Sequence, residues 1–367
     1  MTQEDVMTQA VSLHIGINNF DANHYGITAP LTACVNDAYA MRDIAKARGF
    51  KPTVLIDQQA TYNAITGFLL KQGRDLGPGD TLFVTFAGHG SQTPDLNNDE
   101  RPRTLDQTWC AYDRMIVDDE LAEIWMTYRR GVRVLVVTDS CHNASVARSL
   151  ELLSAIAPAQ RSRDFMASRR GLPPLIGDVV GGQTIQGYRA LPPENRAFVQ
   201  ANYRDLYAAV QRETLGGERA KYKATVLTLS ACRDEEVAAD GDTHGLYTTK
   251  LLDVWNEGAF AGNYRQFQDQ IATAVSSAAT LASQVQNPQY VIYGEPNDAF
   301  EAEQPFSGGS VPPTGVITKS SMTVYPPISS NGDNDNDGSS RVKLTIPPAL
   351  VTSLIANREV LISFSES

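Results

Sequence analysis

Two long apolar runs constrain the fold of this chain more than any other feature of its sequence. Residues 81–87 read TLFVTFA and residues 132–138 read VRVLVVT. Apolar runs without regular polar alternation are typical of strands buried on both faces, as in parallel sheets covered by helices. His89 follows the first run and Cys141 follows the second. Because ligands bind beyond the carboxyl ends of such strands, we expect both side chains to face one crevice.

Strand-like and helix-like segments alternate along most of the chain before residue 304. This order predicts an α/β fold in which a mostly parallel, six-stranded sheet is sandwiched by helices. Residues 93–112 are rich in Asp, Asn, Arg and Pro and are expected to form a loop. Gly49 is expected to end one helix, and Thr61 is expected to cap the next. The other strands are expected at 11–17, 53–56, 224–230 and 289–293, and the helices at 35–48, 61–74, 119–130, 194–214, 246–255 and 264–281.

The composition changes twice along the chain, which suggests how its domains are organised. Residues 1–304 are expected to form one domain, with a large part at about 1–147, a connecting region at about 148–222 and a small part at about 223–304. The Arg-rich connecting region is expected to be exposed over much of its length. Residues 305–367, in which Pro, Ser and Gly become frequent, are expected to form a small β-rich C-terminal extension.

Charge and hydropathy limit the classes of function that this chain can have. The formal net charge of −11 argues against nonspecific binding to nucleic acid. No run of about 18 apolar residues is present, so we expect no transmembrane helix and no membrane partner. The first residues lack the basic and apolar regions of a secretory signal, and the four cysteines form no C-x-x-C pair. We therefore expect a cytoplasmic protein with free thiols.

Cys141 and His89 can act together as a nucleophile and its base. A free thiol has a pKa of about 8.5, and a neighbouring imidazole raises the thiolate fraction by forming an ion pair. The same imidazole can later protonate a leaving amine. At Gly90 there is room for a backbone N–H to face a developing oxyanion, as the N–H of Cys141 itself can. The separation of about 50 residues is close to the caspase pattern and predicts a cysteine peptidase.

The histidines and cysteines also permit other interpretations. Four of them are potential zinc ligands, but they lack the close paired spacing of structural zinc motifs. Those four are His89, Cys110, Cys141 and His142. Among the remaining histidines, His14 lies inside a predicted strand and is expected in the core. His24 and His244 are expected at the surface.

Two carboxylates are candidates for the wall of a substrate pocket. Asp139 stands two residues before Cys141, and side chains two residues apart along a strand point the same way. Asp37 opens the helix expected at 35–48, where it can also interact with the helix dipole. Together these carboxylates favour a Lys or Arg side chain, since one charge pair at about 4 Å contributes roughly 4 kcal/mol at an effective dielectric near 20. They would repel an aspartate by a similar amount.

Six short segments together resemble the metacaspases, a family of caspase-fold cysteine peptidases. They are LHIGIN (13–18), CVND (34–37), FAGHGSQ (86–92), IVDDEL (116–121), DSCH (139–142) and LSACRD (229–234). The resemblance covers about residues 12–294. It implies a caspase-like fold and cleavage of peptide bonds after Arg or Lys, with His89 and Cys141 as the catalytic dyad.

The same resemblance implies the residues that line the pocket for the side chain preceding the cut bond. These are Cys34, Asp37 and Asp139. Ala87 stands where the family usually has serine, so the pocket has one hydroxyl fewer. Family members often cut themselves between their large and small parts, and the Arg-rich connection offers suitable sites. Metacaspases are also expected to be monomeric, and we expect the same here.

Many metacaspases bind calcium through aspartates outside the active crevice. Asp118 and Asp119 match two of those positions, and Asp106 is a third candidate. Arg148 stands where the family has an acid, and a cation there opposes calcium. No cofactor is therefore expected to be required.

The sequence therefore predicts a cysteine endopeptidase whose protein or peptide substrates carry Arg or Lys at the cleavage site. Three alternatives remain open: a catalytically silent caspase-like binding or signalling module, an Asp-specific peptidase of the caspase type, and a metal-binding protein. The presence of both dyad residues and an acidic pocket argues against the silent module.

Overall fold

The structure is a computed structural model that describes residues 8–96, 105–141, 176–180, 182–214, 222–234, 236–278 and 286–308. All of these residues lie in the unit Met1–Val311. Its centre is a six-stranded sheet with the strand order β13-β11-β7-β3-β1-β2. The strands from β11 to β2 are parallel, and β13 is antiparallel to β11, which confirms the mostly parallel sheet. The strands are β1 (Ala10–Gly16), β2 (Lys51–Ile56), β3 (Thr81–Ala87), β7 (Arg133–Asp139), β11 (Thr225–Ser230) and β13 (Gln289–Gly294).

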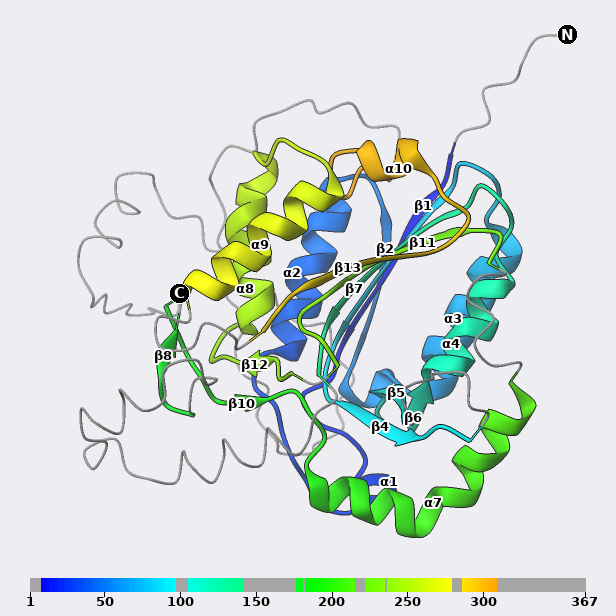
Figure 1. Cartoon of the computed structure of the whole chain (residues 1–367), viewed down its shortest axis with the longest axis vertical. Coiled ribbons are helices and arrows are strands. Elements are labelled where there is room, and N and C mark those ends of the chain that lie inside the picture. Colours follow the sequence, from blue (N-terminus) through cyan, green and yellow to red (C-terminus); the bar gives the residue numbers. More distant parts are fainter. Residues whose placement is uncertain are drawn as a thin grey trace, which may run out of the picture. The chain divides into compact units, whose positions relative to one another are not determined.

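Helices cover both faces of this sheet, as the buried strands predicted (Figure 1). On one face, α2 (Cys34–Ala47), α8 (Leu246–Trp255) and α9 (Tyr264–Ala278) pack against a cluster that includes Phe83 and Leu135. On the other face, α3 (Tyr62–Asp75) and α4 (Asp118–Met126) pack against a cluster that includes Val84 and Val134. Successive residues of β3 and β7 therefore enter opposite cores, which explains their nearly continuous apolar sequence.

Local sequence signals set the ends of several elements. The Thr61 hydroxyl accepts a hydrogen bond from the backbone N–H of Ala64 at 3.2 Å, so Thr61 is the cap that the sequence predicted for α3. Gly49 has a φ of 84° just after α2, in the conformation that ends helices. Gly16 ends β1, and a Cβ there would lie 2.4 Å from the carbonyl oxygen of Cys34. Its missing side chain lets α2 begin directly against the strand end.

The prediction of a loop at 93–112 is wrong in part. A three-stranded antiparallel sheet of order β4-β5-β6 occupies the described part of this region and continues to residue 117. Its strands are short, and their buried positions include polar residues, so the segment lacks an apolar pattern. The sheet forms because these strands pair with one another, and no single segment carries a sequence pattern that predicts this pairing. The strands are β4 (Gly90–Pro94), β5 (Leu105–Cys110) and β6 (Met115–Val117).

The connecting region is not uniformly exposed. The helix expected at 194–214 is confirmed as α7 (Pro193–Glu213), and it lies with α1 (Ala22–Tyr25) below the strand ends in Figure 1. Arg189, by contrast, is fully buried, so its expected exposure is wrong. Two short strands, β10 (Gly187–Tyr188) and β12 (Ala239–Asp240), pair antiparallel beside it. The remaining elements are β8 (Val179–Val180), β9 (Gln183–Thr184), α10 (Asp298–Ala302) and the 3₁₀ turns Asp57–Gln59 and Asn256–Gly258.

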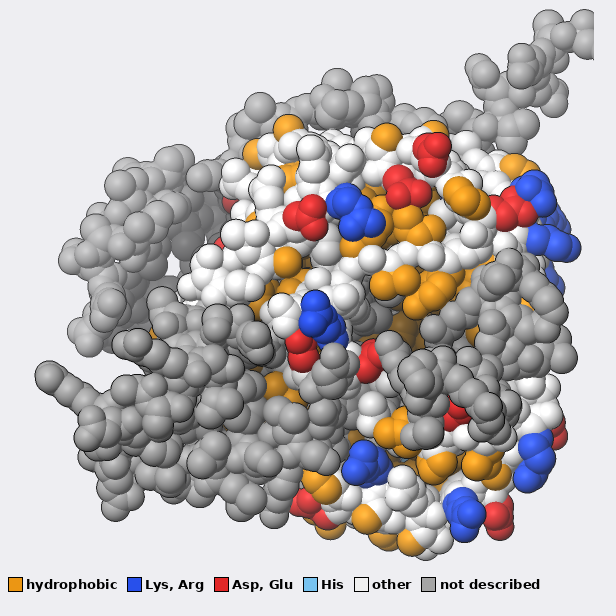
Figure 2. Space-filling view, viewed as in Figure 1, with side chains coloured by type: hydrophobic (Ala, Val, Ile, Leu, Met, Phe, Trp, Pro, Cys, Tyr) orange, Lys and Arg blue, Asp and Glu red, His pale blue; other side chains and the backbone are white. Residues whose placement is uncertain are grey.

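The expected C-terminal extension begins at residue 305, and residues 309–367 lie outside the described residues. His142 and Arg148 also lie outside them. Among the described helices, we find none with the length and apolar character needed to cross a bilayer. On the face drawn in Figure 2, single basic side chains are interspersed with acidic ones, so the described residues of that face form no extended basic stripe.

Candidate active site

The ends of β3 and β7 bring His89 and Cys141 to one place. These strands are neighbours, and Ala87 pairs with Asp139 in the parallel register. The N–H of Gly90, next to His89, and the N–H of Cys141 both donate to the carbonyl oxygen of Arg189, at 2.8 and 3.2 Å. Two backbone donors from neighbouring strand ends therefore converge on a single oxygen atom.

The His89 ring is buried, and its hydrogen bonding distinguishes its two nitrogens. Nε2 donates to the carbonyl oxygen of Ala29 at 2.8 Å. In a neutral imidazole this leaves Nδ1 as the nitrogen with a lone pair that can take a proton. Burial lowers the pKa of His89 to about 4, although the backbone of Ala29 and that of Ala190 act in the opposite direction. The ring is therefore uncharged at neutral pH and can serve as a base.

The Cys141 thiol is fully buried beside the same peptide segment. Burial raises the pKa of Cys141 to about 12, against the lowering effects of the backbone of Ala238 and of Arg189. The thiol is therefore protonated at neutral pH in this arrangement. The thiol and the imidazole are therefore both neutral. The backbone of Arg189 affects the pKa of Cys141, and the backbone of Ala190 affects the pKa of His89.

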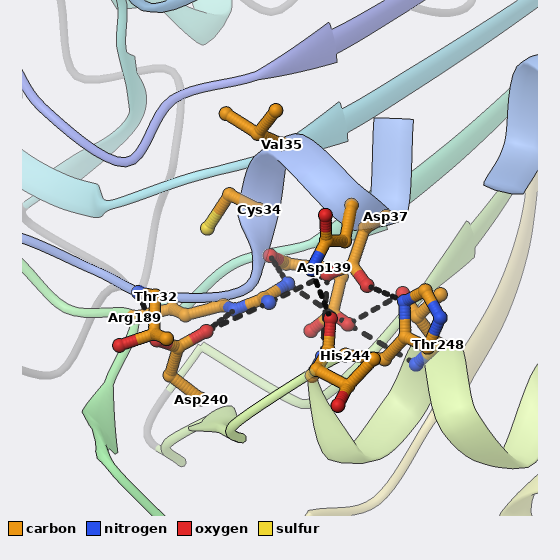
Figure 3. Close-up of polar contacts among 12 residues, drawn as sticks. Thr32, Cys34, Val35, Asp37, Asp139, Arg189, Asp240, His244 and Thr248 are labelled. Carbon is orange, nitrogen blue, oxygen red and sulfur yellow. Dashed lines mark hydrogen bonds and ion pairs between the residues drawn. The ribbon is translucent and has the colours of Figure 1, made fainter. Parts of the chain in front are cut away.

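Three buried carboxylates surround the side chain of Arg189 (Figure 3). We call Asp37, Asp139 and Asp240 the carboxylate pocket. Arg189 Nη2 lies 2.5 Å from an oxygen of Asp37 and 2.9 Å from Asp240 Oδ1. Its Nε also donates to Asp240 at 3.2 Å, and its Nη1 lies 3.0 Å from Asp139 Oδ2. Each nitrogen of the guanidinium therefore contacts at least one carboxylate oxygen, and together they reach all three carboxylates.

Further groups hold each carboxylate in position. Nδ1 of His244 lies 2.8 Å from Asp37 Oδ1. The hydroxyl of Thr248 donates to Asp139 Oδ2 at 2.8 Å, and the backbone N–H of Thr248 donates to it at 3.1 Å. The backbone N–H of Thr32 donates to Asp240 Oδ2 at 2.7 Å. Each carboxylate therefore has at least one further partner besides Arg189.

Small residues form the walls of the pocket. Cys34 and Ala87 belong to one buried cluster with Leu31. Burial raises the pKa of Cys34 while Arg189 acts to lower it, which is consistent with the sulfur lying beside the guanidinium (Figure 3). A Cβ on Gly245 would lie 2.5 Å from Asp139 Oδ2 and 2.6 Å from Arg189 Cζ. Glycine at this position therefore leaves the space that the guanidinium fills.

The three carboxylates differ in how readily they ionise. Burial raises the pKa of Asp37, but Arg189 and His244 outweigh it, so the pKa is lowered overall. Burial dominates at Asp139 and raises its pKa to about 6, although Arg189 opposes this. Burial also raises the pKa of Asp240. The pocket therefore carries strong negative charge at neutral pH and loses part of it in weak acid.

Sequence reasoning missed several members of this site. It did not single out Asp240 or Thr248, and their short segments carry no motif that points to a pocket. The surface position predicted for His24 is wrong, because its ring is buried against the Tyr207 hydroxyl. His244 is partly exposed, with 21% of its side chain accessible. His14 is buried between Ser12 and Thr85, as predicted.

The calcium candidates lie elsewhere in the unit. Asp106 is on β5, and Asp118 and Asp119 are in the first turn of α4. Asp118 accepts from the backbone of Gln107, and Asp119 accepts from the hydroxyl of Thr214. Across the ranges that the structure describes, no three or more His, Cys, Asp or Glu side chains form a group that could hold a metal ion. The predictions that no cofactor is required, and that Asp106, Asp118 and Asp119 are calcium candidates, stay predictions.

Comparison with known proteins identifies similar chains. The caspase domain model matches residues 9–294. Metacaspase-1 of Eremothecium gossypii is 27% identical over 264 residues, which are 65% of this chain and 54% of that protein. Metacaspase-7 of Arabidopsis thaliana is 32% identical over 145 residues, which are 37% of this chain and 35% of that protein. The chain spans about half the length of the first curated relatives it matches.

A solved structure is similar over nearly all of its own length. The crystal structure of protein GSU0716 from Geobacter sulfurreducens has a TM-score of 0.65 and 30% sequence identity. The similarity covers 82% of this chain and 99% of that chain.

Proposed function

Since the chain belongs to the family of caspase-like peptidases, we propose that it is a cysteine endopeptidase that cleaves protein or peptide substrates after Arg or Lys. The proposal includes a monomeric enzyme, no required cofactor, and self-processing in the Arg-rich connection. One observation carries it most directly. A single arginine has its side chain in the carboxylate pocket and its carbonyl oxygen on the N–H groups of Gly90 and Cys141.

The geometry of that arginine supports a mechanism for peptide cleavage. With a substrate in the same position, Nδ1 of His89 takes the proton of the Cys141 thiol, and the sulfur attacks the carbonyl carbon. The two backbone N–H groups stabilise the negative charge that develops on the carbonyl oxygen. His89 then donates its proton to the leaving amine, and water hydrolyses the thioester that remains on Cys141.

The pocket supports selection of a cationic side chain before the cut bond. An arginine there contacts carboxylates through Nε, Nη1 and Nη2. A lysine has one charged nitrogen and cannot make all of these contacts at once. An aspartate would place a fourth negative charge among Asp37, Asp139 and Asp240. We therefore infer a preference for Arg, followed by Lys, and rejection of Asp.

A panel of fluorogenic peptides that differ only in this residue tests the proposal. We expect kcat/KM to be highest for the Arg peptide, lower for the Lys peptide and at least about 100-fold lower for the Asp peptide, because the charge interaction reverses its sign. Equal or faster cleavage of the Asp peptide would favour the Asp-specific alternative. Lack of cleavage of all three peptides, with calcium and with a chelator, would favour the silent binding module.

Activity on the Arg peptide is expected to fall in weak acid. The pKa of Asp139 is raised to about 6, so its carboxyl gains a proton as the pH falls from 7 to 5, where an ordinary aspartate stays ionised. That proton removes one negative charge facing the guanidinium. We expect kcat/KM to drop about tenfold between pH 7 and pH 5, chiefly through KM. The pH profile of an Asp139→Asn variant should lack this acid limb, and an unchanged profile would contradict the assignment.

A further inference from the structure

We propose that the Arg189–Ala190 peptide bond is the bond this chain cuts in itself, and that residues 187–191 occupy the substrate cleft until the cut is made. This inference rests on the proposed function and names the bond at which self-processing occurs. Both the backbone of the segment and the Arg189 side chain make contacts that support it.

Backbone pairing holds the segment on both sides of the bond, with a bend at Arg189 between the two paired parts. Before the bond, β10 pairs antiparallel with β12, and the N–H of Arg189 donates to the carbonyl oxygen of Ala238 at 2.9 Å. After the bond, Ala190 forms a bridge with Gly90, and the N–H of Leu191 donates to the carbonyl oxygen of Gly90 at 2.7 Å. Addition of an extended strand is a common way in which proteins bind peptides.

The reacting groups surround this one bond. The carbonyl oxygen of Arg189 already accepts from the two N–H groups that would stabilise an oxyanion. The attacked carbonyl is thus bound to the backbone N–H of Cys141. The leaving residue, Ala190, pairs with Gly90, the residue that follows His89.

A purely structural arginine would not require this arrangement. Buried ion pairs need the carboxylates around the guanidinium, but they do not need the carbonyl of the same residue to bind the N–H of Cys141. Neighbours on both sides are also buried, with Tyr188 in the core cluster that contains Cys141 and Leu191 in a separate cluster with Phe20. The segment therefore fills the cleft as a bound peptide would.

The cleavage step balances with one water. The proton of the Cys141 thiol moves to His89, and a bond forms between the sulfur and the carbonyl carbon of Arg189. The bond from that carbon to the nitrogen of Ala190 breaks, and His89 gives its proton to this nitrogen. Water then cleaves the thioester, which leaves a carboxyl group on Arg189, restores the thiol and produces a new amino terminus at Ala190.

Until this step, a second peptide has no free pocket to enter, because the Arg189 guanidinium fills it. Cleavage frees the chain end at Arg189 and allows the segment to leave. Freshly purified, uncut protein should therefore show a lag in peptide cleavage. The length of the lag should match the half-time of self-cleavage.

Incubation of the intact chain tests the proposal. We expect intact mass and N-terminal sequencing to find fragments 1–189 and 190–367 from the wild type and an uncut chain from Cys141→Ala. Because Arg189 is fully buried in its own molecule, the rate should be independent of protein concentration. Added wild-type enzyme should leave the Cys141→Ala chain intact at this bond. That comparison keeps Arg189 in place and does not depend on how an arginine variant folds.

Arg189→Gln is expected to slow cleavage at this bond at least about 100-fold. Arg204→Gln, which changes an exposed arginine of α7, is the matched control and should be cut like the wild type. Cleavage of the Arg peptide without a new amino terminus at Ala190 would overturn this inference and leave the proposed function standing. Concentration-dependent cutting of Cys141→Ala at this bond would also overturn it. Loss of both peptide cleavage and self-cleavage in the wild type would overturn the proposed function itself.

Discussion

Replacement of Cys141 with alanine is expected to reduce kcat/KM on an Arg peptide by at least about 1,000-fold. This corresponds to about 4 kcal/mol of transition-state stabilisation at 1.36 kcal/mol for each factor of ten. Alanine keeps the backbone N–H that binds the carbonyl oxygen but removes the sulfur that forms the acyl intermediate in the proposed mechanism. His89→Ala should cause a similar loss, and the double variant should lose little more, because the two groups act as a unit.

Cys110→Ala provides the matched control for this loss. The Cys110 side chain is also fully buried, but it packs with Phe20 and Met115 and not in the carboxylate pocket. Its backbone N–H donates to the carbonyl oxygen of His89 at 3.0 Å, and alanine retains that bond. We expect kcat/KM within about threefold of wild type, with some loss of thermal stability from the small cavity. Equal activity of Cys141→Ala and wild type would remove the basis of the peptidase proposal.

Gly245→Ala is expected to lower kcat/KM for Arg and Lys peptides by about 100-fold through steric exclusion from the carboxylate pocket. The new Cβ would lie 2.5 Å from Asp139 Oδ2 and 2.6 Å from the position of a guanidinium carbon, closer than atoms pack. Gly245 has a φ of −60° and a ψ of 155°, which alanine adopts without strain. The loss should therefore come from the pocket and not from the backbone, and it should be largest in KM.

The control for this variant is Gly67→Ala in the middle of α3. A Cβ at that position would meet no atom within 4 Å, and alanine favours helix over glycine by about 1 kcal/mol. We expect unchanged peptide cleavage and equal or higher thermal stability. Wild-type kinetics in Gly245→Ala, measured with circular dichroism to confirm the fold, would mean that the substrate side chain binds outside the carboxylate pocket.

The sheet could be predicted from the sequence because burial on both faces leaves a local signature. The apolar run that became β3 and the run that became β7 each read as a buried strand without reference to any other part of the chain. Their ends also located His89, Cys141 and Asp139, since residues just beyond parallel strands share one edge of the sheet. The antiparallel strands β4 and β5 lack such a run, so the sequence predicts a loop over 93–112 where the structure has part of β4 and all of β5.

The pocket was predictable only in part, because its members come from distant segments. Asp37 and Asp139 followed from their place beside predicted elements. Thr248 lies in a predicted helix, α8, and Asp240 on the short strand β12, but neither segment carries a motif for a pocket. Their roles depend on how folding places β12 and α8 beside the other carboxylates. The sequence predicts an exposed Arg189 among the basic residues of the connection, whereas the structure buries it fully.

By itself, the sequence determined which segments become buried strands and helices, and which chemically reactive side chains follow the strand ends. These properties depend on periodicity and on neighbours a few residues away. Only the tertiary structure decided that Arg189 meets Asp37, although 152 residues separate them. A buried charge gains its stability from partners brought together by folding. No local pattern distinguishes Arg189, which meets three carboxylates, from an arginine such as Arg204, whose side chain is exposed.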